Sequence, residues 1–114
     1  MALSKARARK LLQRFEDVSE APHFDRPAFR TPRRIFATLA ADGRDVNFML
    51  DPLEQASLCE IAPAALAPVP GGWGRMGWTR CDLKKVDEAI FVAASEAAHA
   101  RAAEARKGGR AKRG

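Results

Sequence analysis

The sequence lacks long apolar runs and has few cysteine residues. No apolar stretch approaches the roughly 20 residues that a membrane-spanning helix needs. The basic N-terminus is not followed by the apolar segment of a secretory signal. Cys59 and Cys81 stand 22 positions apart and form no C-x-x-C pair, which indicates reduced thiols rather than a disulfide. We therefore expect a cytoplasmic protein without a membrane span.

Motifs of enzymes and of metal sites are also missing. His23 and His99 are the two histidines, and neither has another His or Cys at metal-ligand spacing. The sequence contains no G-x-x-x-x-G-K-[ST] loop and no dinucleotide fingerprint after a strand. No nucleophile motif surrounds its serines or cysteines. We expect a protein that is not an enzyme and that uses no metal or cofactor.

What the chain does have is positive charge at both ends. Its net charge is +6. Residues 1–15 carry five basic residues and no acid, and residues 101–114 carry six basic residues and one Glu. The segment between them has nine basic and thirteen acidic residues. A compact DNA-binding face is expected to carry its charge within the domain, so this distribution leaves the two basic arms to contact phosphates.

Apolar spacing and turn residues predict the order of the elements. We expect a helix over about 4–18, a Pro-bracketed connection over 21–27, strands over 28–31, 35–41 and 44–50, a helix over about 52–61, a short strand over 64–69, a Gly-rich loop over 70–77, a strand over about 78–83 and a helix over about 84–105.

The clearest local signal is the Asp42-Gly43 pair between two strand-like runs. Asp-Gly is the preferred two-residue hairpin turn, because both positions need positive φ. The pairs that this turn predicts are Leu39–Val46, Ala37–Phe48 and Ile35–Leu50 on one apolar face, with Thr38, Asn47 and the Phe36–Met49 pair on a partly solvated face.

Capping residues mark two of the helices. Asp51-Pro52-Leu53-Glu54 has the acid, the proline and the Glu of a helix start. This helix is expected to bury side chains drawn from Leu53, Ala56, Leu58 and Ile61. Asp82 is the expected cap of the last helix, whose predicted buried stripe is Val86, Ile90, Ala93 or Ala94, and Ala97.

These elements predict an α+β fold. We expect an antiparallel sheet of about four to five strands, flanked by N-terminal, middle and C-terminal helices. Residues 1–105 form a single domain in this interpretation. Residues 106–114 form a disordered basic tail, because they have almost nothing apolar to bury.

Several short motifs resemble the MmcQ/YjbR-like family of small bacterial proteins. They are Pro22-His23-Phe24, Pro27-Ala28-Phe29, Phe36-Ala37-Thr38-Leu39 before Asp42-Gly43, Gln55, Pro68-Val69-Pro70-Gly71-Gly72-Trp73-Gly74, Gly77-Trp78-Thr79, and Leu83 with Val86-Asp87. The resemblance spans about residues 10–100, and the two Trp in the Gly-rich loop are its most specific element. It implies a fold similar to secretion chaperones and frataxin, and DNA binding through a paired-wing surface. Frataxin-like iron binding would need an acidic first helix, and here that helix is basic.

Trp73 and Trp78 are the most informative side chains of the Gly-rich loop. Aromatic rings on such a loop can stack on bases, and Arg75 beside them can reach a phosphate. The rings can equally pack on the sheet to hold the loop in place. Both interpretations fit the sequence.

Basic residues cluster around the first predicted strand and its turn, at Arg26, Arg30, Arg33 and Arg34. A hairpin tip with arginines is what a wing presents to the phosphate backbone, and an ordinary solvated surface looks the same. Lys84 and Lys85 can extend such a face.

The leading hypothesis is a non-enzymatic binding module with DNA as its partner. The candidate nucleic-acid-binding residues are Arg30, Arg33, Arg34, Trp73, Arg75, Lys84 and Lys85. A protein- or peptide-interaction domain is the main alternative, and a small-ligand site beside the Gly/Trp loop is another. A cleft beside Trp73 with convergent polar groups would favour the last.

Overall fold

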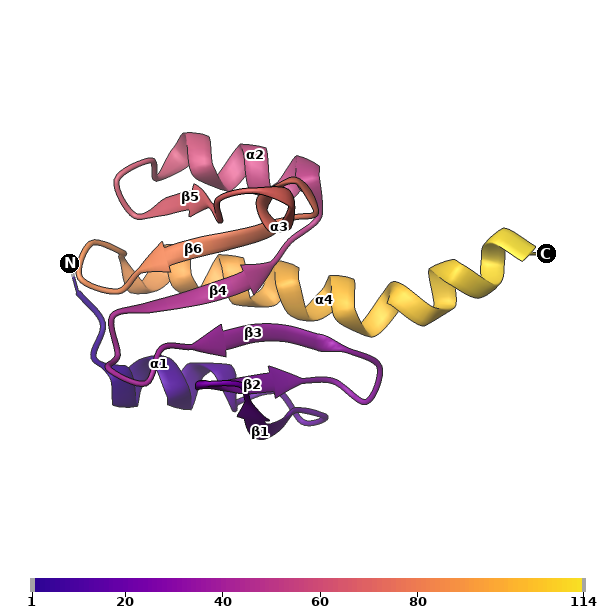
Figure 1. The fold of residues 1–114 in the computed structure, drawn as a ribbon, viewed down its shortest axis with the longest axis horizontal. Coiled ribbons are helices and arrows are strands. Elements are labelled where there is room, and N and C mark those ends of the chain that lie inside the picture. The colour runs from indigo at the N-terminus through magenta and orange to yellow at the C-terminus, as the bar shows by residue number, and fades with distance from the viewer. Residues whose placement is uncertain (1, 114) are drawn as a thin grey trace.

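One antiparallel sheet forms the body of the protein (Figure 1). The computed structural model describes the backbone of residues 2–113 and the side chains of residues 2–104. Within this part, the six strands are β1 (Ser19–His23), β2 (Arg26–Arg30), β3 (Ile35–Leu39), β4 (Asp45–Met49), β5 (Leu66–Pro68) and β6 (Trp78–Asp82). They lie in the order β1-β2-β3-β4-β6-β5. The α+β prediction is confirmed, with slightly more strands than the four to five expected.

Helices cover one face of this sheet and leave the other uncovered. The helices in the described part are α1 (Lys5–Leu12), α2 (Pro52–Ile61), α3 (Gly72–Arg75) and α4 (Glu88–Arg113). Helix α4 packs on β3 and β4 and passes behind the sheet in Figure 1. An ion pair between Arg7 and Glu88 ties α1 to α4. Helices α2 and α3 pack beside β5 and β6, at one edge of the sheet.

The core lies between the sheet and the α1–α4 layer. One apolar row crosses four strands and is at most 2% exposed: Leu39, Val46, Cys81 and Leu66. In the next row, the Phe48 ring meets Phe91 of α4 edge-to-face, with the ring centroids 5.3 Å apart. Full burial of such a side chain stabilises the fold by about 1.5–3 kcal/mol, so these contacts hold α4 onto the sheet.

The β3–β4 hairpin has the predicted register but a longer turn. Its cross-strand pairs include Leu39–Val46 and Ala37–Phe48, as expected. The Ala40 N–H donates to the Asp45 carbonyl, and the Ala40 carbonyl accepts from the Gly43 N–H, both at 2.9 Å. Only Gly43 has positive φ in this loop, at 77°. The expected two-residue turn needs positive φ at Asp42 as well, so that part of the prediction is wrong.

Phe36 lies on the opposite side from the one predicted. It is fully buried, and its ring packs edge-to-face on Phe15 and on His99 of α4, at centroid distances of 5.8 and 5.5 Å. A register shift between β2 and β3 at Phe29 and Arg30 accompanies this change. The side chains at the start of β3 therefore do not alternate between the two faces of the sheet as the prediction assumed.

Strand β1 occupies the segment that was expected to be a connection. It pairs with β2, and Pro22 lies opposite Pro27. The turn between them contains Phe24, whose φ of 58° is the one positive value among the described residues other than glycine. A proline is tolerated in an edge strand because one side of that strand forms no ladder, which accounts for Pro22. Pro27 lies in β2, one residue before the first residue that pairs with β3.

The helices differ from prediction mainly at their ends. Helix α1 begins at Lys5, after a Ser4 cap and close to the expected start, and ends at Leu12 rather than near 18. Helix α4 begins at Glu88 rather than at 84, because Asp82 caps a preceding turn: its carboxylate accepts from the Lys84 N–H at 2.9 Å, and its carbonyl accepts from Val86 N–H at 3.1 Å.

The buried faces of α2 and α4 also differ in part. Asp51 caps α2 as predicted, by accepting from the Leu53 N–H, but the Leu53 side chain is exposed and Leu58 is the predicted residue that is buried. On α4 the fully buried side chains are Phe91, Ala94, Ser95 and Ala98. The expected disorder of residues 106–114 stays a prediction, since side chains from residue 105 on lie outside the described residues.

Candidate functional site

Most basic side chains of the N-terminal segment bond within the fold. Lys5 Nζ donates to the Ala41 carbonyl at 2.6 Å. Three arginines form ion pairs with other elements: Arg7–Glu88 at 2.7 Å, Arg9–Glu20 at 2.9 Å and Arg14–Glu96 at 3.4 Å. The hydrogen bond from Arg7 lowers the pKa of Glu88. This segment is therefore largely committed to holding α1 in place.

Thr31 builds the turn between β2 and β3. Its Oγ1 accepts the N–H groups of Arg33 and Arg34 at 3.1 and 3.2 Å, and its own N–H donates to the Arg34 carbonyl. Arg30 Nε donates to the Thr31 carbonyl at 3.2 Å. Among the described side chains, Arg33 and Arg34 have no ion-pair partner. The turn thus holds its backbone firmly and presents two unpaired guanidinium groups.

Helix α3 presents Trp73 and Arg75. Beneath it, Gln55 of α2 donates from Nε2 to the Gly74 carbonyl and to Thr79 Oγ1, both at 3.0 Å. This buried amide fixes the Gly-rich loop on the sheet, so the Trp73 ring is not needed for that purpose. The ring is 61% exposed. Arg75 is exposed and has no ion-pair partner within the described part of the chain.

The predicted residues divide between the two ends of the sheet. Strands β3 and β6 both run antiparallel to β4, so both begin at the same end. The β2–β3 turn precedes β3, and α3 precedes β6. We call this the arginine end, and its residues are Arg30, Arg33, Arg34, Trp73 and Arg75. Lys84 and Lys85 follow the last residue of β6 and lie at the opposite end, about 16 Å away along the strands.

A groove of about 260 Å³ crosses the uncovered face of the sheet. It lies between the β1–β2 turn and the loop that contains α3. Its walls include the ring or apolar side chains of His23, Phe24, Val69 and Trp73, and its floor is Thr38, Asn47 and the half-buried Trp78. Two charged residues of the β1–β2 hairpin, Asp25 and Arg26, also line it. Phe24 is 94% exposed. The groove therefore combines aromatic side chains with a polar floor.

A buried carboxylate organises the charge next to this groove. Asp45 accepts from Arg26 at 2.8 Å through one oxygen and from Arg80 Nε at 3.2 Å through the other. Arg26 Nε also donates to Thr38 Oγ1 at 2.9 Å. Asp25, which lines the groove beside Arg26, adds a second carboxylate, so the two cations and two anions of this region balance. Arg80 is half exposed, and its terminal nitrogens have no partner among the described residues.

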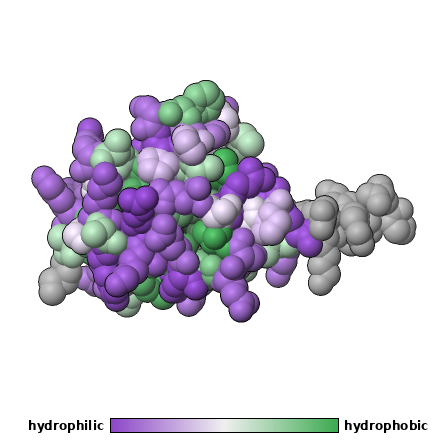
Figure 2. Space-filling model, turned by 90° about the horizontal axis from the view of Figure 1, so that it is seen from below, coloured by the Kyte–Doolittle hydropathy of each residue, from purple (hydrophilic) through white to green (hydrophobic). Residues whose placement is uncertain are grey.

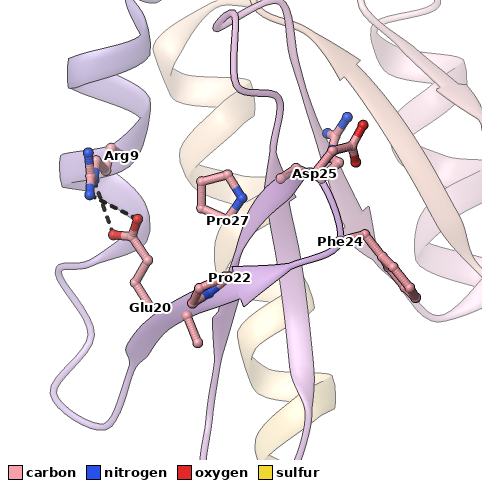
Figure 3. A pocket seen from close by; sticks show the side chains of 8 residues that line it. Arg9, Glu20, Pro22, Phe24, Asp25 and Pro27 are labelled. Carbon is pink, nitrogen blue, oxygen red and sulfur yellow. Dashed lines mark hydrogen bonds and ion pairs between the residues drawn. The ribbon is translucent and has the colours of Figure 1, made fainter.

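A second hollow, of about 570 Å³, lies at the β1–β2 edge (Figure 3). The Arg9–Glu20 ion pair lines one side of it, and Phe24 projects from the turn away from that pair. Seen from this edge, the surface is mostly hydrophilic, with hydrophobic side chains in separate patches (Figure 2). The open-face groove is the stronger candidate, because it places the exposed Trp73 opposite the exposed Phe24.

Cys81 and His99 take part in packing and hydrogen bonding within the fold. Burial raises the pKa of Cys81 to about 12, so its thiol stays protonated. The His99 ring stacks on Phe15 at 4.0 Å, and its Nε2 lies 2.8 Å from Asp17 Oδ1. In the described part of the chain, no group of three or more His, Cys, Asp or Glu is placed to hold a metal ion. Within the same residues, no helix has both the length and the apolar character needed to cross a bilayer.

Comparison with known proteins adds the family. The YjbR family model matches residues 13–101. The chain belongs to the YjbR family. A crystal structure of a Deinococcus radiodurans protein with a DUF419 domain is similar, with a TM-score of 0.69 and 15% identity, over 83% of this chain and 75% of that one. At this identity the likeness shows the fold alone. Among curated proteins, none matches the sequence.

Several residues of the groove in this YjbR-family chain were not singled out as binding residues from sequence. Asn47 was placed on the partly solvated side of the hairpin, and that signal is correct. Arg80 lies next to Asn47 on the same face but outside the groove lining, and the pairing of β6 with β4 that places it there is not visible in local patterns. Phe24 was missed because its segment was interpreted as a connection.

Proposed function

We propose that this YjbR-family protein is a non-enzymatic, cytoplasmic module that binds nucleic acid, with DNA as the first candidate. The observation that supports it is the separation of paired from unpaired cations. Most N-terminal basic side chains bond within the fold. Arg33, Arg34 and Arg75 at the arginine end have no ion-pair partner among the described residues.

Helix α4 brings further positive charge toward this end. Arg101 donates to the Leu50 carbonyl at 3.0 Å, directly after β4, which places this turn of α4 at the arginine end. After Glu104 the sequence carries five more basic residues. A phosphate backbone would therefore meet cations from the β2–β3 turn and from α3, with Arg101 of α4 close by.

Contacts of this kind are mainly electrostatic. Each phosphate that a cation neutralises releases counterions. The logarithm of the binding constant therefore falls linearly as the logarithm of the salt concentration rises, with a slope of about 0.9 for each phosphate contact on duplex DNA. Phosphate contacts carry no sequence information by themselves. We expect weak sequence preference and a steep loss of affinity as salt is raised.

The test is fluorescence anisotropy of labelled DNA with the full chain at several salt concentrations. The double variant Arg33→Ala/Arg34→Ala is compared with Lys84→Ala/Lys85→Ala, which removes the same charge at the opposite end. We expect the arginine variant to bind DNA more weakly and to reduce the slope of log affinity against log salt concentration by about two. Equal effects of both variants would contradict a role for the arginine end, since net charge alone would then govern binding.

A protein partner is the second candidate, and α2 favours it. Leu53 and Ile61 are 82% and 63% exposed on this helix. Two large apolar side chains exposed near opposite ends of one helix are a candidate contact surface for another protein. Sedimentation velocity of the purified chain tests whether the partner is another copy. A concentration-dependent dimer that Leu53→Ser abolishes supports this, and a monomer at every concentration contradicts it.

A further inference from the structure

Phe24 combines a strained backbone conformation with an exposed aromatic ring. Its φ is 58°, a left-handed conformation that costs a bulky side chain about 1–2 kcal/mol. At 94% exposure, its ring recovers little of this by burial. Its ring contact among the described residues is with His23, at 4.7 Å. Strained residues of this kind gather at sites that bind ligands, which is a reason to ask what the ring contacts.

The groove offers that contact. Phe24 lines one wall and the exposed Trp73 lines the other, across a volume of about 260 Å³. This space is small for a drug-sized ligand and suits one planar ring system. Aromatic side chains exposed in this way stack on bases, whose faces are free only in a single strand.

The floor supplies a group that can recognise the edge of a ring. Asn47 lies at the centre of the uncovered face, between Thr38 and Arg80 in register. Its side-chain amide has no hydrogen-bond partner within the described residues, unlike Thr38, whose Oγ1 accepts from Arg26. An amide has both donors and an acceptor, the combination that pairs with the edge of a base.

Arg80 supplies the complementary charge for a backbone. One nitrogen, Nε, is bonded to Asp45, which fixes the direction of the side chain. The terminal nitrogens remain open on the same face as Asn47 and can donate to a phosphate. An apolar peptide side chain would use the aromatic walls but would leave the Asn47 amide and the terminal nitrogens of Arg80 without a partner.

We propose that this groove holds one unpaired base of a single-stranded nucleic acid, between Phe24 and Trp73, with Asn47 at its edge and Arg80 at its phosphate. The inference rests on the proposed nucleic-acid function and makes it specific for single strands. The arginine end holds the flanking phosphates, and the groove supplies the preference for unpaired bases.

The experiment titrates the full chain with three probes: a short mixed-sequence single strand, its blunt-ended duplex and a free nucleoside monophosphate. Binding is followed by anisotropy and by quenching of Trp emission. We expect the single strand to bind about tenfold more tightly than the duplex. Phe24→Asn should weaken the single strand by about tenfold and leave the duplex unchanged, because stacking on one ring contributes a factor of this order.

Stability provides an independent check on Phe24→Asn. Asn tolerates positive φ, so the variant should unfold at a higher urea concentration while it binds more weakly. Leu53→Asn, which also removes an exposed apolar side chain, is the control and should not change binding. Asn47→Ala should weaken the single strand and leave the salt slope as it was, because no ionic contact is lost.

The outcomes separate the two proposals. Equal binding of single strand and duplex, unaffected by Phe24→Asn, would overturn the groove inference and leave the arginine end as a phosphate site. A free nucleotide that binds as tightly as the strand would show a small-ligand site and would also overturn it. If no nucleic acid binds at low salt, the proposed function itself fails.

Discussion

Gly74 has less freedom to change than any neighbour in α3. A Cβ at this position would lie 2.0 Å from the Val69 carbonyl oxygen, which is backbone and cannot move aside cheaply. At Gly72, in the same turn of helix, the nearest atom to a new Cβ is the end of the Arg75 side chain at 3.7 Å. Two glycines two positions apart therefore differ completely in their tolerance.

We predict that Gly74→Ala destabilises the fold by about 2–3 kcal/mol, because the loop must shift to relieve the overlap. Gly72→Ala should be neutral or slightly stabilising, because alanine favours helix. Urea unfolding of both variants measures the difference. A Gly74→Ala protein as stable as Gly72→Ala would show that the loop does not lie on Val69 as described.

Cys81 makes stability depend on alkaline pH. Burial raises its pKa from 9.0 to about 12, so the unfolded chain loses this proton at a lower pH than the folded one. Its contribution to stability is present in full below pH 9 and is lost as the pH rises toward 12. The sequence has no tyrosine whose titration would add to this range.

We predict that the free energy of unfolding falls above pH 9, with a slope of up to about 1.4 kcal/mol per pH unit from this thiol. Cys81→Ala should flatten the slope even though the cavity lowers stability at neutral pH. Urea unfolding from pH 7 upward measures both. An unchanged slope in the variant would rule out Cys81 as the titrating group.

Helix α2 is joined to the rest of the sheet by one buried polar side chain, in addition to the apolar packing of Leu58. Gln55 is buried, and its amide joins α2 to α3 through Gly74 and to β6 through Thr79. The Thr79 hydroxyl in turn donates to the Gly77 carbonyl at 3.0 Å. Three elements thus meet at a single amide group.

We predict that Gln55→Ala destabilises the protein by about 2–3 kcal/mol, since it removes the hydrogen bonds to Gly74 and Thr79 and leaves a cavity at a buried position. It should also release α3 and change the emission of Trp73. The exposed neighbour Glu54 provides the control. Glu54→Ala should lower the free energy of unfolding much less, although it removes a favourable acid near the helix N-terminus. Equal losses from the two variants would contradict a special role for Gln55.

The sequence predicted best the features that depend on residues close together in the chain. The Asp51 cap and the β3–β4 register depend on neighbours in the chain, and both were correct. Strand β1 forms because β2 lies beside it, and prolines hid that pairing. For the groove, sequence identified Trp73 and the solvated side of β4, but it could not bring Phe24 and Arg80 to the same face, because that depends on strand order.

The complete fold includes the N-terminal residues in its core. Leu12 and Ala8 are fully buried, Leu3 and Leu11 are 8% exposed, and the Leu3 N–H donates to the Leu83 carbonyl at 2.8 Å. Burial of the three leucines alone contributes about 5 kcal/mol or more, which is of the order of a whole domain's stability. The basic start of the chain is thus part of the folded body.

We predict that a chain lacking residues 1–15 is largely unfolded at room temperature. Circular dichroism and urea unfolding measure this directly. Arg9→Gln, which removes charge but no buried side chain, is the control and should remain folded. A truncated chain with a cooperative transition near that of the full protein would contradict the packing of α1 described above.

Both edges of the sheet end in strands that contain proline. Pro22 lies in β1, and Pro68 lies in the three-residue β5. An edge strand normally offers a row of free N–H and C=O groups to which another chain can add, which is how many sheet proteins aggregate. Here each edge lacks a donor, and one edge is very short. The sheet is therefore closed to growth by strand addition, and a concentrated solution of the protein should resist forming fibrils.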